Sequence, residues 1–296
     1  MRVLCANHGA LPFTGTPSDA TLATALGAQV AAGLDVLTDG QPGWSDAITP
    51  LLAPLDGVRL GAPHTLPLGI HLAARPIVQA KLRRHHPLLV AAYRRAAGLT
   101  AQPLKVVLTG PYTLAQAAEI GTTAYRQVGD LAADLSMLLA QEITALVAAG
   151  ASLIQIDEPL LLARPDDAPL LRTLLEPLVD AAGTTARVLI ATYGADAGTC
   201  YAQLNSLPGD IIAVDCAGRP EVVAAIAETG SGKPLALGLV DGRTPALEDR
   251  ETLRALLARL LARYPHDEVW LQPSCGLAGL TPPQANAKLR LLASLR

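Results

Sequence analysis

The chain has 296 residues, of which 50% are hydrophobic and 17% charged, and its formal net charge at pH 7 is −3. A weakly acidic chain without basic runs gives no reason to expect nucleic-acid binding, and no uninterrupted apolar stretch reaches the roughly 18 residues of a membrane span. Its four cysteines lack the spacing of a secreted disulfide domain. We therefore expect a soluble, cytoplasmic, single-domain protein without a signal peptide.

Short apolar runs alternate along the chain with longer segments of helical spacing, which are clearest at residues 125–149 and 248–264. Such alternation predicts right-handed βαβ crossovers and a parallel sheet. Eight repeats in a chain of this length predict a (β/α)₈ TIM barrel that spans residues 1–296 as one domain. The eight predicted strands are residues 2–5, 34–37, 105–108, 153–156, 187–191, 211–214, 235–239 and 269–271.

One stretch, near residues 56–72, does not follow this alternation. It is rich in Gly and Pro, which favour turns over helices or long strands. We expect it to form an excursion, such as a β-hairpin, over one end of the barrel.

The residues that follow the strands of a parallel barrel share one face, where such folds place their chemistry. Six of the eight predicted strand ends carry an ionisable or metal-capable side chain within a few residues. A barrel that needed only stability would not require this, so we expect a small-molecule site there. The candidates, in chain order, are His8, Gly9, Asp39, Tyr112, Asp157, Glu158, Tyr193, Asp215, Cys216, Asp241, Arg243 and Cys275.

The pair Asp157 and Glu158 ends the apolar run Leu-Ile-Gln-Ile at residues 153–156. Adjacent residues of an extended chain point to opposite sides, so one carboxylate can face the barrel mouth while the other secures a neighbouring loop. The mouth-facing carboxylate, for which Asp157 is the candidate, would hold a cationic group such as a substrate amine. The alternative is helix capping, with Pro159 at the first helical position.

Three further residues each have two interpretations. The thiol of Cys275, in Gln-Pro-Ser-Cys-Gly, is either a metal ligand or nucleophile, or a small buried apolar group. Cys216, next to Asp215, has the same alternatives. His8 either binds a carboxylate or orients a ligand at the mouth of the first strand.

Several of these segments resemble the cobalamin-independent methionine synthase family. The matching segments are Gly-Leu-Asp-Val-Leu-Thr-Asp-Gly at 33–40, Leu-Thr-Gly-Pro-Tyr-Thr-Leu at 108–114, Ile-Gln-Ile-Asp-Glu-Pro at 154–159 and Pro-Ser-Cys-Gly at 273–276. The resemblance implies a (β/α)₈ catalytic unit in which zinc activates the thiol of homocysteine. The thiol takes a methyl group from a folate or a methyl-corrinoid, and a corrinoid protein or partner subunit would be the macromolecular partner.

The resemblance also implies residue roles. The family's zinc ligands are a His-x-Cys pair after the fifth strand, a Glu after the sixth and a Cys after the eighth. Cys275 matches the last and Asp215 lies near the Glu position, while Cys216 or His8 would have to supply a third ligand. The fifth strand here continues Thr-Tyr-Gly-Ala-Asp, without the His-x-Cys pair. Asp157 would hold the substrate amino group and the 8–12 loop its carboxylate.

The second half of the chain is similar to the family's zinc-free amino-terminal barrel. The similarity rests on Thr-Tyr-Gly at 192–194, Val-Asp-Gly-Arg at 240–243 and Pro-Ser-Cys-Gly at 273–276. The two resemblances leave three functions open: homocysteine methyl transfer, methyl transfer to another thiol or methyl carrier without zinc, or a non-catalytic barrel that binds a small ligand or partner. Methyl transfer is the expectation that we carry forward, without assigning a catalytic residue.

Overall fold

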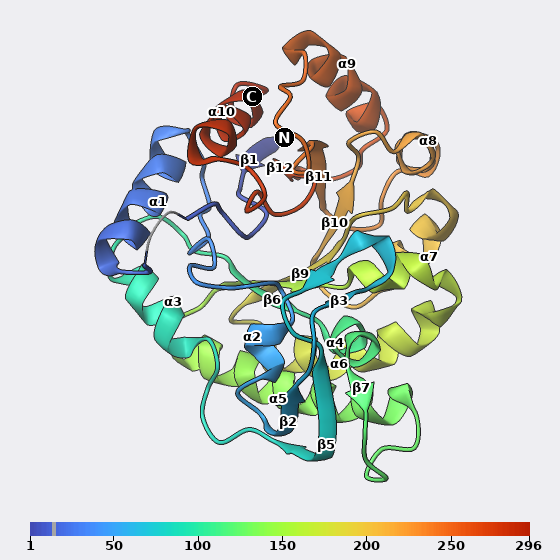
Figure 1. Ribbon diagram of the computed structural model, residues 1–296. Coiled ribbons are helices and arrows are strands. Elements are labelled where there is room, and N and C mark those ends of the chain that lie inside the picture. Colours follow the sequence, from blue (N-terminus) through green and yellow to red (C-terminus); the bar gives the residue numbers. More distant parts are fainter. Residues whose placement is uncertain (14–15) are drawn as a thin grey trace.

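A computed structural model of the chain describes residues 1–13 and 16–296. At its centre lies a parallel sheet whose strands are surrounded by helices, with the two termini close together beside β1 and α10 (Figure 1). Its seven strands, in spatial order, are β1 (Arg2–Cys5), β12 (Glu268–Pro273), β11 (Leu235–Val240), β10 (Ile211–Asp215), β9 (Arg187–Thr192), β8 (Leu153–Asp157) and β6 (Val106–Thr109). Residues 34–37 bridge the two edge strands, since Ala6 pairs with Val36 and Leu37 with Leu104, and this closes a (β/α)₈ barrel.

Seven of the eight predicted strands are confirmed, with shifts of one or two residues at their ends. The prediction for residues 34–37 is wrong, because this segment forms two isolated bridges instead of a regular strand. Its Asp35 carboxylate accepts the backbone N–H of Cys5 at 2.7 Å, where a regular ladder would use a backbone carbonyl. The segment still occupies the second position of the barrel wall.

The helices cover the outer face of the barrel. Helix α5 is by length and composition apolar enough to cross a membrane. Its side chains Leu131, Leu135, Leu139 and Ile143 are buried, and it packs against α4 and α6, so it is a core helix of the barrel. The helices are α1 (Asp19–Ala31), α2 (Thr49–Leu52), α3 (Val90–Ala97), α4 (Pro111–Ala117), α5 (Val128–Ala148), α6 (Ala168–Ala182), α7 (Tyr201–Ser206), α8 (Pro220–Thr229), α9 (Arg250–Leu261) and α10 (Pro282–Ala293).

The side chains of the strands alternate between the barrel interior and the helix layer, as the pleat requires. Alternate strand residues form an apolar cluster inside the barrel, separate from the larger core beneath the helices. The interior cluster consists of Leu4, Ala6, Val36, Leu153, Leu189, Ala191, Ile211, Ala213, Ala236 and Trp270. On β8, β10 and β12 the next inward-facing positions toward the carboxyl ends are the polar residues Gln155, Asp215 and Gln272, which lie in or beneath the candidate site.

The excursion near residues 56–72 extends to Arg83. Strand β2 (Asp56–Leu60) pairs antiparallel with β5 (Pro76–Arg83), and between them β3 (His64–Thr65) pairs with β4 (His71–Leu72). Strand β7 (Glu119–Ile120) adds to the other edge of β5. The turn at Pro67–Gly69 contacts the 3₁₀ segment Pro159–Ala163 that follows Glu158, and the side chain of Leu68 lies against Gly194. The excursion therefore covers part of the barrel mouth.

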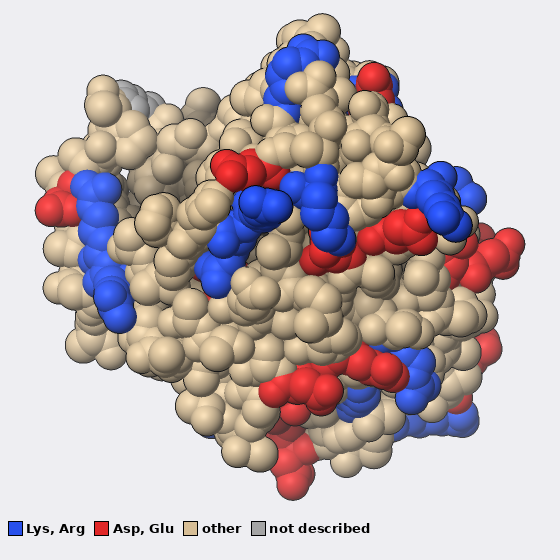
Figure 2. All heavy atoms as spheres, turned by 90° about the horizontal axis from the view of Figure 1, so that it is seen from below, with Lys and Arg blue, Asp and Glu red and all other residues tan. Residues whose placement is uncertain are grey.

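The surface carries charges of both signs. On the face in Figure 2, Lys and Arg side chains lie beside Asp and Glu side chains in small groups, separated by wide uncharged areas. Exposed pairs such as Arg254–Glu251 contribute to the mixture of charges on the surface. The face shown does not present the single-sign basic stripe that follows a nucleic-acid backbone.

The start of helix α4 depends on a buried carboxylate. Glu158, which is fully buried, accepts the backbone N–H groups of Tyr112 at 3.0 Å and Thr113 at 2.7 Å. These N–H groups have no partner within the helix, so the carboxylate satisfies them and interacts favourably with the positive end of the helix dipole. A Cβ atom at Gly110 would lie 2.2 Å from Oε1 of Glu158, which explains the glycine at this position.

The substitution Gly110→Ala should therefore displace the Glu158 carboxylate and lower the free energy of unfolding by about 3 kcal/mol, because two charge-assisted hydrogen bonds to a buried group are lost. Urea denaturation measures the change. The matched control is Gly27→Ala in the exposed face of α1, where the new Cβ would meet nothing within 4 Å. That control should be neutral or stabilising by up to about 1 kcal/mol. Equal effects of the two substitutions would contradict this account.

Candidate functional site

Three of the predicted site residues meet at the barrel mouth. His8 follows β1, Asp157 ends β8 and Tyr193 follows β9. Nε2 of His8 lies 3.5 Å from Oδ2 of Asp157, and the Tyr193 hydroxyl donates to the same oxygen at 3.3 Å. The rings of His8 and Tyr193 pack edge to face with their centroids 4.9 Å apart. Two side chains, one from the strand next to β8 and one from β1 across the barrel, thus converge on one carboxylate.

Asp157 is 5% exposed and faces inward, as predicted for the carboxylate of the pair. Its Oδ1 accepts a hydrogen bond of 2.7 Å from Nε2 of Gln155, two residues earlier on the same strand. Burial, followed by the nearby negative charge of Asp157, raises the pKa of the Tyr193 hydroxyl well above its ordinary value. Tyr193 therefore acts toward Asp157 as a neutral hydrogen-bond donor.

Sequence reasoning missed three residues beneath this carboxylate: Lys105, Gln155 and Gln272, all buried. The Lys105 amine donates to Oε1 of Gln155 at 2.5 Å and to Oε1 of Gln272 at 3.1 Å. Burial lowers the pKa of Lys105 to about 7, and the negative charge of Asp157 opposes this shift. For Gln155 and Gln272 the sequence did contain a signal. Each is a polar residue within an apolar strand, two residues before Asp157 or Ser274, and therefore on the same side of the strand as that residue.

Glu158, Tyr112 and Gly9 are not placed to bind a ligand at the mouth. Glu158 points away from Asp157 and caps α4, as described above. Tyr112 is 1% exposed and its hydroxyl donates to Asp167 at 2.6 Å. The carbonyl oxygen of Gly9 accepts from the side chains of Asn7 and Thr38, each at 2.7 Å. For these three positions the structure supports a structural role in place of the predicted contact with substrate.

Because Glu158 is buried, the stability of the fold should depend on pH. Burial raises the pKa of Glu158 from 4.5 to about 7, and the donors at Thr113 and Tyr112 oppose the shift. Between these two values the folded state binds more protons than the unfolded state, so the free energy of unfolding falls as pH rises, and the loss is complete above pH 7.

Between pH 4.5 and 7.5 the wild type should therefore lose on the order of 3 kcal/mol of stability relative to Glu158→Gln, which does not titrate. Urea titrations of both proteins across this range measure the difference. A difference that stays constant with pH would show that Glu158 does not titrate in this window.

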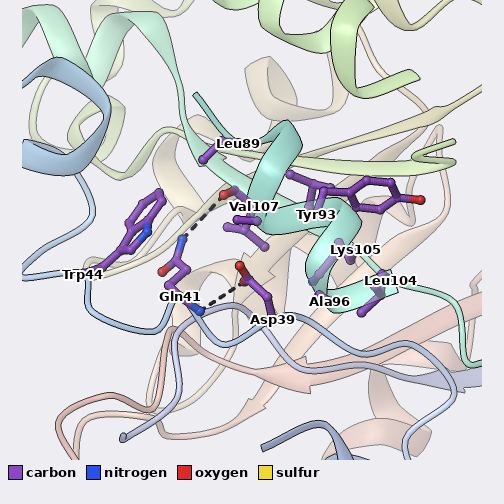
Figure 3. A pocket seen from close by; sticks show the side chains of 11 residues that line it. Asp39, Gln41, Trp44, Leu89, Tyr93, Ala96, Leu104, Lys105 and Val107 are labelled. Atoms are coloured by element: carbon purple, nitrogen blue, oxygen red, sulfur yellow. Dashed lines mark hydrogen bonds between the residues drawn. The ribbon is translucent and has the colours of Figure 1, made fainter. Parts of the chain in front are cut away.

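Asp39 lies in a different environment. It lines a cavity of about 20 Å³ between α3 and the segment before β6, together with Gln41, Trp44 and Tyr93 (Figure 3). Its Oδ1 accepts the backbone N–H of Gln41, and burial raises the pKa of its carboxyl. The cavity is about the size of one water molecule. The cavity is also lined by Lys105, but not by His8, Asp157 or Tyr193.

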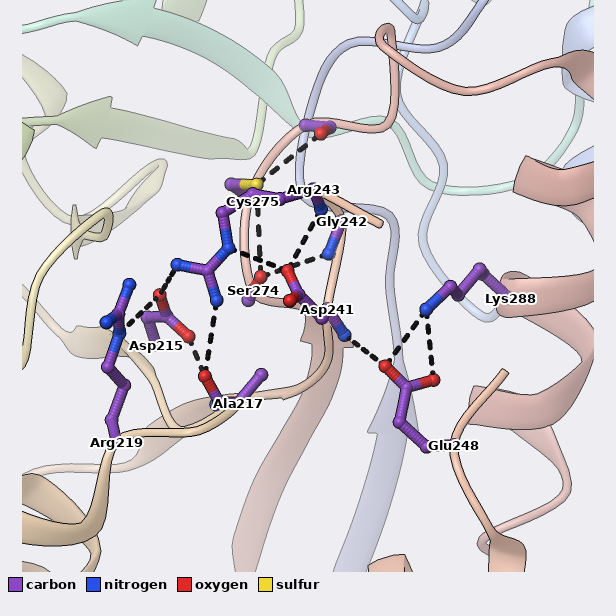
Figure 4. A network of polar contacts seen from close by, with 11 residues as sticks. Asp215, Ala217, Arg219, Asp241, Gly242, Arg243, Glu248, Ser274, Cys275 and Lys288 are labelled. Atoms are coloured by element: carbon purple, nitrogen blue, oxygen red, sulfur yellow. Dashed lines mark hydrogen bonds and ion pairs between the residues drawn. The ribbon is translucent and has the colours of Figure 1, made fainter. Parts of the chain in front are cut away.

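The three predicted metal ligands do not converge. Asp215 faces inward, but its Oδ1 accepts the backbone N–H of Ala217 and its Oδ2 accepts from Arg219 at 3.2 Å and Arg243 at 3.1 Å (Figure 4). Cys216 is the next residue and so points outward, where its thiol is buried in the core under the helices and lies 3.8 Å from the carbonyl of Val214.

Cys275 alone of the three has a thiol near the mouth. It receives a weak hydrogen bond from Ser274 and lies beside Arg243, while burial raises its pKa to about 11. Within residues 1–13 and 16–296, no three His, Cys, Asp or Glu side chains are grouped so that they could hold a metal ion. Zinc requires about three protein ligands, mainly nitrogen and sulfur, so this arrangement does not fit a zinc site. The prediction of Cys275, Asp215 and Cys216 as joint ligands is wrong for this geometry.

Arg243 occupies the space between the ends of β10 and β11. Its Nε donates to Asp241 at 2.7 Å and its Nη1 to Asp215, so one guanidinium joins two carboxylates (Figure 4). Asp241 and Arg243, both candidates from the sequence, thus form an ion pair with each other, and the cluster extends to Asp215 and Arg219. This cluster rigidifies the mouth on the side opposite α4.

Comparisons with known proteins agree with this architecture. A B12-independent methionine synthase from Shewanella sp. W3-18-1, solved in complex with selenomethionine, superposes with a TM-score of 0.86 at 20% identity, covering 98% of this chain and 96% of that one. A putative vitamin-B12 independent methionine synthase from Listeria monocytogenes gives a TM-score of 0.77 at 17% identity, covering 98% of this chain and 95% of that one. These likenesses establish the fold.

Sequence relatives lead to the same family. The chain is 29% identical over 283 residues to a 5-methyltetrahydropteroyltriglutamate–homocysteine methyltransferase from Nitratidesulfovibrio vulgaris, covering 90% of this chain but 35% of that protein. It is 29% identical over 260 residues to a methionine synthase from Saccharolobus solfataricus, covering 87% of this chain and 77% of that protein. The chain thus spans about a third of the length of the first of these relatives. The family model described as "Cobalamin-independent synthase, Catalytic domain" matches residues 8–295, so the chain belongs to the cobalamin-independent methionine synthase family.

Proposed function

We propose that the chain is a methyltransferase that moves a methyl group from a methylated folate to the thiol of homocysteine and forms methionine. Its membership of the family and the printed activities of its relatives support this reaction. The observation that carries the assignment to this chain is the buried, mouth-facing carboxylate of Asp157.

Asp157 is suited to hold the substrate ammonium group. A carboxylate offers about four lone-pair positions. In this site Gln155 and Tyr193 donate hydrogen bonds to Asp157, and Nε2 of His8 lies 3.5 Å from Oδ2, so at least one position remains for a further donor. The group that donates to the remaining position of the Asp157 carboxylate should be a cation, because a buried negative charge is stabilised most by a charged donor. An α-amino acid supplies such a group.

In the proposed reaction the sulfur of the acceptor attacks the methyl carbon of the donor. A carbon–sulfur bond forms as the bond between the methyl carbon and the folate nitrogen breaks. The thiol proton lost by the acceptor balances the proton gained by that nitrogen. Asp157 would hold the acceptor so that its thiol lies in the mouth, and such orientation contributes to catalysis by itself. Since the residues do not fit zinc, no step is derived through a metal.

The test is direct transfer of an isotopically labelled methyl group. The purified chain would be incubated with L-homocysteine and with methylated tetrahydrofolate in its monoglutamate and triglutamate forms, or with methylcobalamin, each with chelator and with added zinc. We expect labelled methionine from at least one folate form, and less of it from the Asp157→Asn variant. If labelled methionine formed only with methylcobalamin, the proposed folate donor would be wrong and the methyl donor would be a corrinoid. No labelled methionine under any of these conditions would refute the proposal.

A further inference from the structure

Five buried side chains form a closed ring of polar contacts inside the barrel. They come from four parts of the wall: His8 after β1, Lys105 before β6, Gln155 and Asp157 on β8, and Gln272 on β12. Each is at most 5% exposed. Lys105 contacts both glutamines, Gln155 contacts Asp157, and Gln272 contacts Nδ1 of His8 at 3.3 Å. The contact between His8 and Asp157 closes the ring.

The chemistry of Lys105 fixes the orientation of both amides. Both the ammonium and the neutral amine of Lys105 have N–H donors for the two glutamine oxygens. With each Oε1 turned toward Lys105, each Nε2 must point the other way. The Nε2 of Gln155 then faces Asp157, and the Nε2 of Gln272 faces His8. The contacts of the Lys105 amine with both Oε1 atoms thus determine that both Nε2 atoms are directed at Asp157 and His8.

This orientation leaves one arrangement for a neutral His8. A neutral imidazole has one N–H donor and one acceptor nitrogen. The ring partner of Nδ1 is an amide donor, Nε2 of Gln272, so Nδ1 must accept. Nε2 of His8 lies 3.2 Å from the amide nitrogen of Gln155, a donor that already points at Oδ1 of Asp157, and 3.5 Å from Oδ2 of Asp157, which is an acceptor. The proton therefore belongs on Nε2, where it points toward the carboxylate.

We propose that Lys105 is a positioning residue, which acts through Gln155 and Gln272 to hold His8 as its Nε2–H tautomer and to direct two donors at Asp157. The inference deepens the proposed function, on which it rests only for the identity of the ligand. Its consequence is that His8 is not a free ligand-binding group, because both ring nitrogens are used within the ring. Lys105 therefore influences how Asp157 binds an ammonium group without itself contacting the ligand.

Nitrogen NMR of protein labelled with ¹⁵N-histidine tests the proposal without any ligand. The His8 signal is assigned by its loss in His8→Asn. The wild type should show the two-bond coupling pattern of the Nε2–H tautomer for His8. In Gln272→Glu, a carboxylate oxygen replaces the amide donor next to Nδ1 while the contact with Lys105 is retained. This variant should move a proton onto Nδ1, giving either the other tautomer or the doubly protonated ring.

Lys105→Met is the second variant, and it frees the Gln272 amide to turn. It should give a mixture of His8 tautomers and a methionine affinity at least about tenfold lower. Lys233→Met is the control, since Lys233 precedes β11 at the opposite end of the barrel and donates to backbone carbonyls. It should leave the His8 pattern unchanged.

An Nδ1–H tautomer in the wild type would overturn the proposal, as would an unchanged pattern in Gln272→Glu. If the tautomer behaves as expected but methionine does not bind, the proposed function fails and the role of Lys105 stands. Gln272→Glu keeps the volume and the Lys105 contact, so the test remains decisive even if Lys105→Met does not fold.

Discussion

Asp157→Asn is expected to weaken the binding of L-methionine about 100-fold, which corresponds to about 2.7 kcal/mol. The reason is that the substitution removes the negative charge from a buried group that is 5% exposed and is proposed to bind an ammonium ion. Loss of one partner from a buried, hydrogen-bonded charge pair typically costs about 2–5 kcal/mol. Isothermal titration calorimetry at constant pH and salt measures the change.

Two controls separate loss of the ammonium contact from a general disturbance of the site. The first is 4-(methylthio)butanoate, which is methionine without its amino group. Its affinity should differ little between the wild type and Asp157→Asn. The second is Asp39→Asn, which alters a partly buried carboxylate in the small cavity next to α3, a cavity that Asp157 does not line, and should leave methionine binding unchanged. Equal losses for both ligands, or for both variants, would remove the assigned role of Asp157.

Asp215→Ala should destabilise the metal-free protein by about 3 kcal/mol, because it leaves the two guanidiniums of Arg219 and Arg243 without their shared buried carboxylate. Burial raises the pKa of Asp215, and these two cations oppose the shift. Urea denaturation after treatment with a chelator measures the effect. Asp241→Ala is the control, with an expected loss of about 1 kcal/mol for a partly exposed pair.

The same experiment distinguishes a structural from a metal-binding role for Asp215. If it were mainly a zinc ligand, its replacement would lower the zinc content and leave the chelated protein almost unaffected. We expect the opposite: a clear loss of stability, and less than about 0.1 equivalents of zinc in wild-type protein purified without chelator, since three suitable ligands are not grouped. One equivalent of zinc, lost in Asp215→Ala, would contradict our description of the site.

The periodicity of apolar runs was sufficient to predict the barrel, because buried parallel strands and amphipathic helices leave strong patterns. The failure at residues 34–37 has a local cause. The carboxylate of Asp35 takes a hydrogen bond that backbone groups usually make, and no apolar pattern reports such a substitution. The excursion ends at Arg83 and not near residue 72, because β5 (Pro76–Arg83) pairs with β2 (Asp56–Leu60) and is therefore part of the same small sheet.

The site was predictable where it depends on strand ends. His8, Asp157 and Tyr193 lie at the ends of β1, β8 and β9, and they meet at the mouth although β1 lies across the barrel from the other two strands. Because adjacent side chains of a strand point to opposite sides, the sequence allowed different roles to be assigned to Asp157 and Glu158. The same rule applied to Asp215 and Cys216 would have excluded Cys216 as a metal ligand at the mouth. The ring partner Gln272 is 167 residues from Lys105, and this contact depends on closure of the barrel, which no local pattern contains.

A crystal structure of the wild-type protein with bound L-methionine tests the central claim most directly. Our account places the ligand at the barrel mouth, with its amino nitrogen about 3 Å from the carboxylate of Asp157. The contacts of Asp157 with Gln155, His8 and Tyr193 should be retained in that complex. A methionine whose amino group is held by other residues, or one bound away from the mouth, would contradict the account.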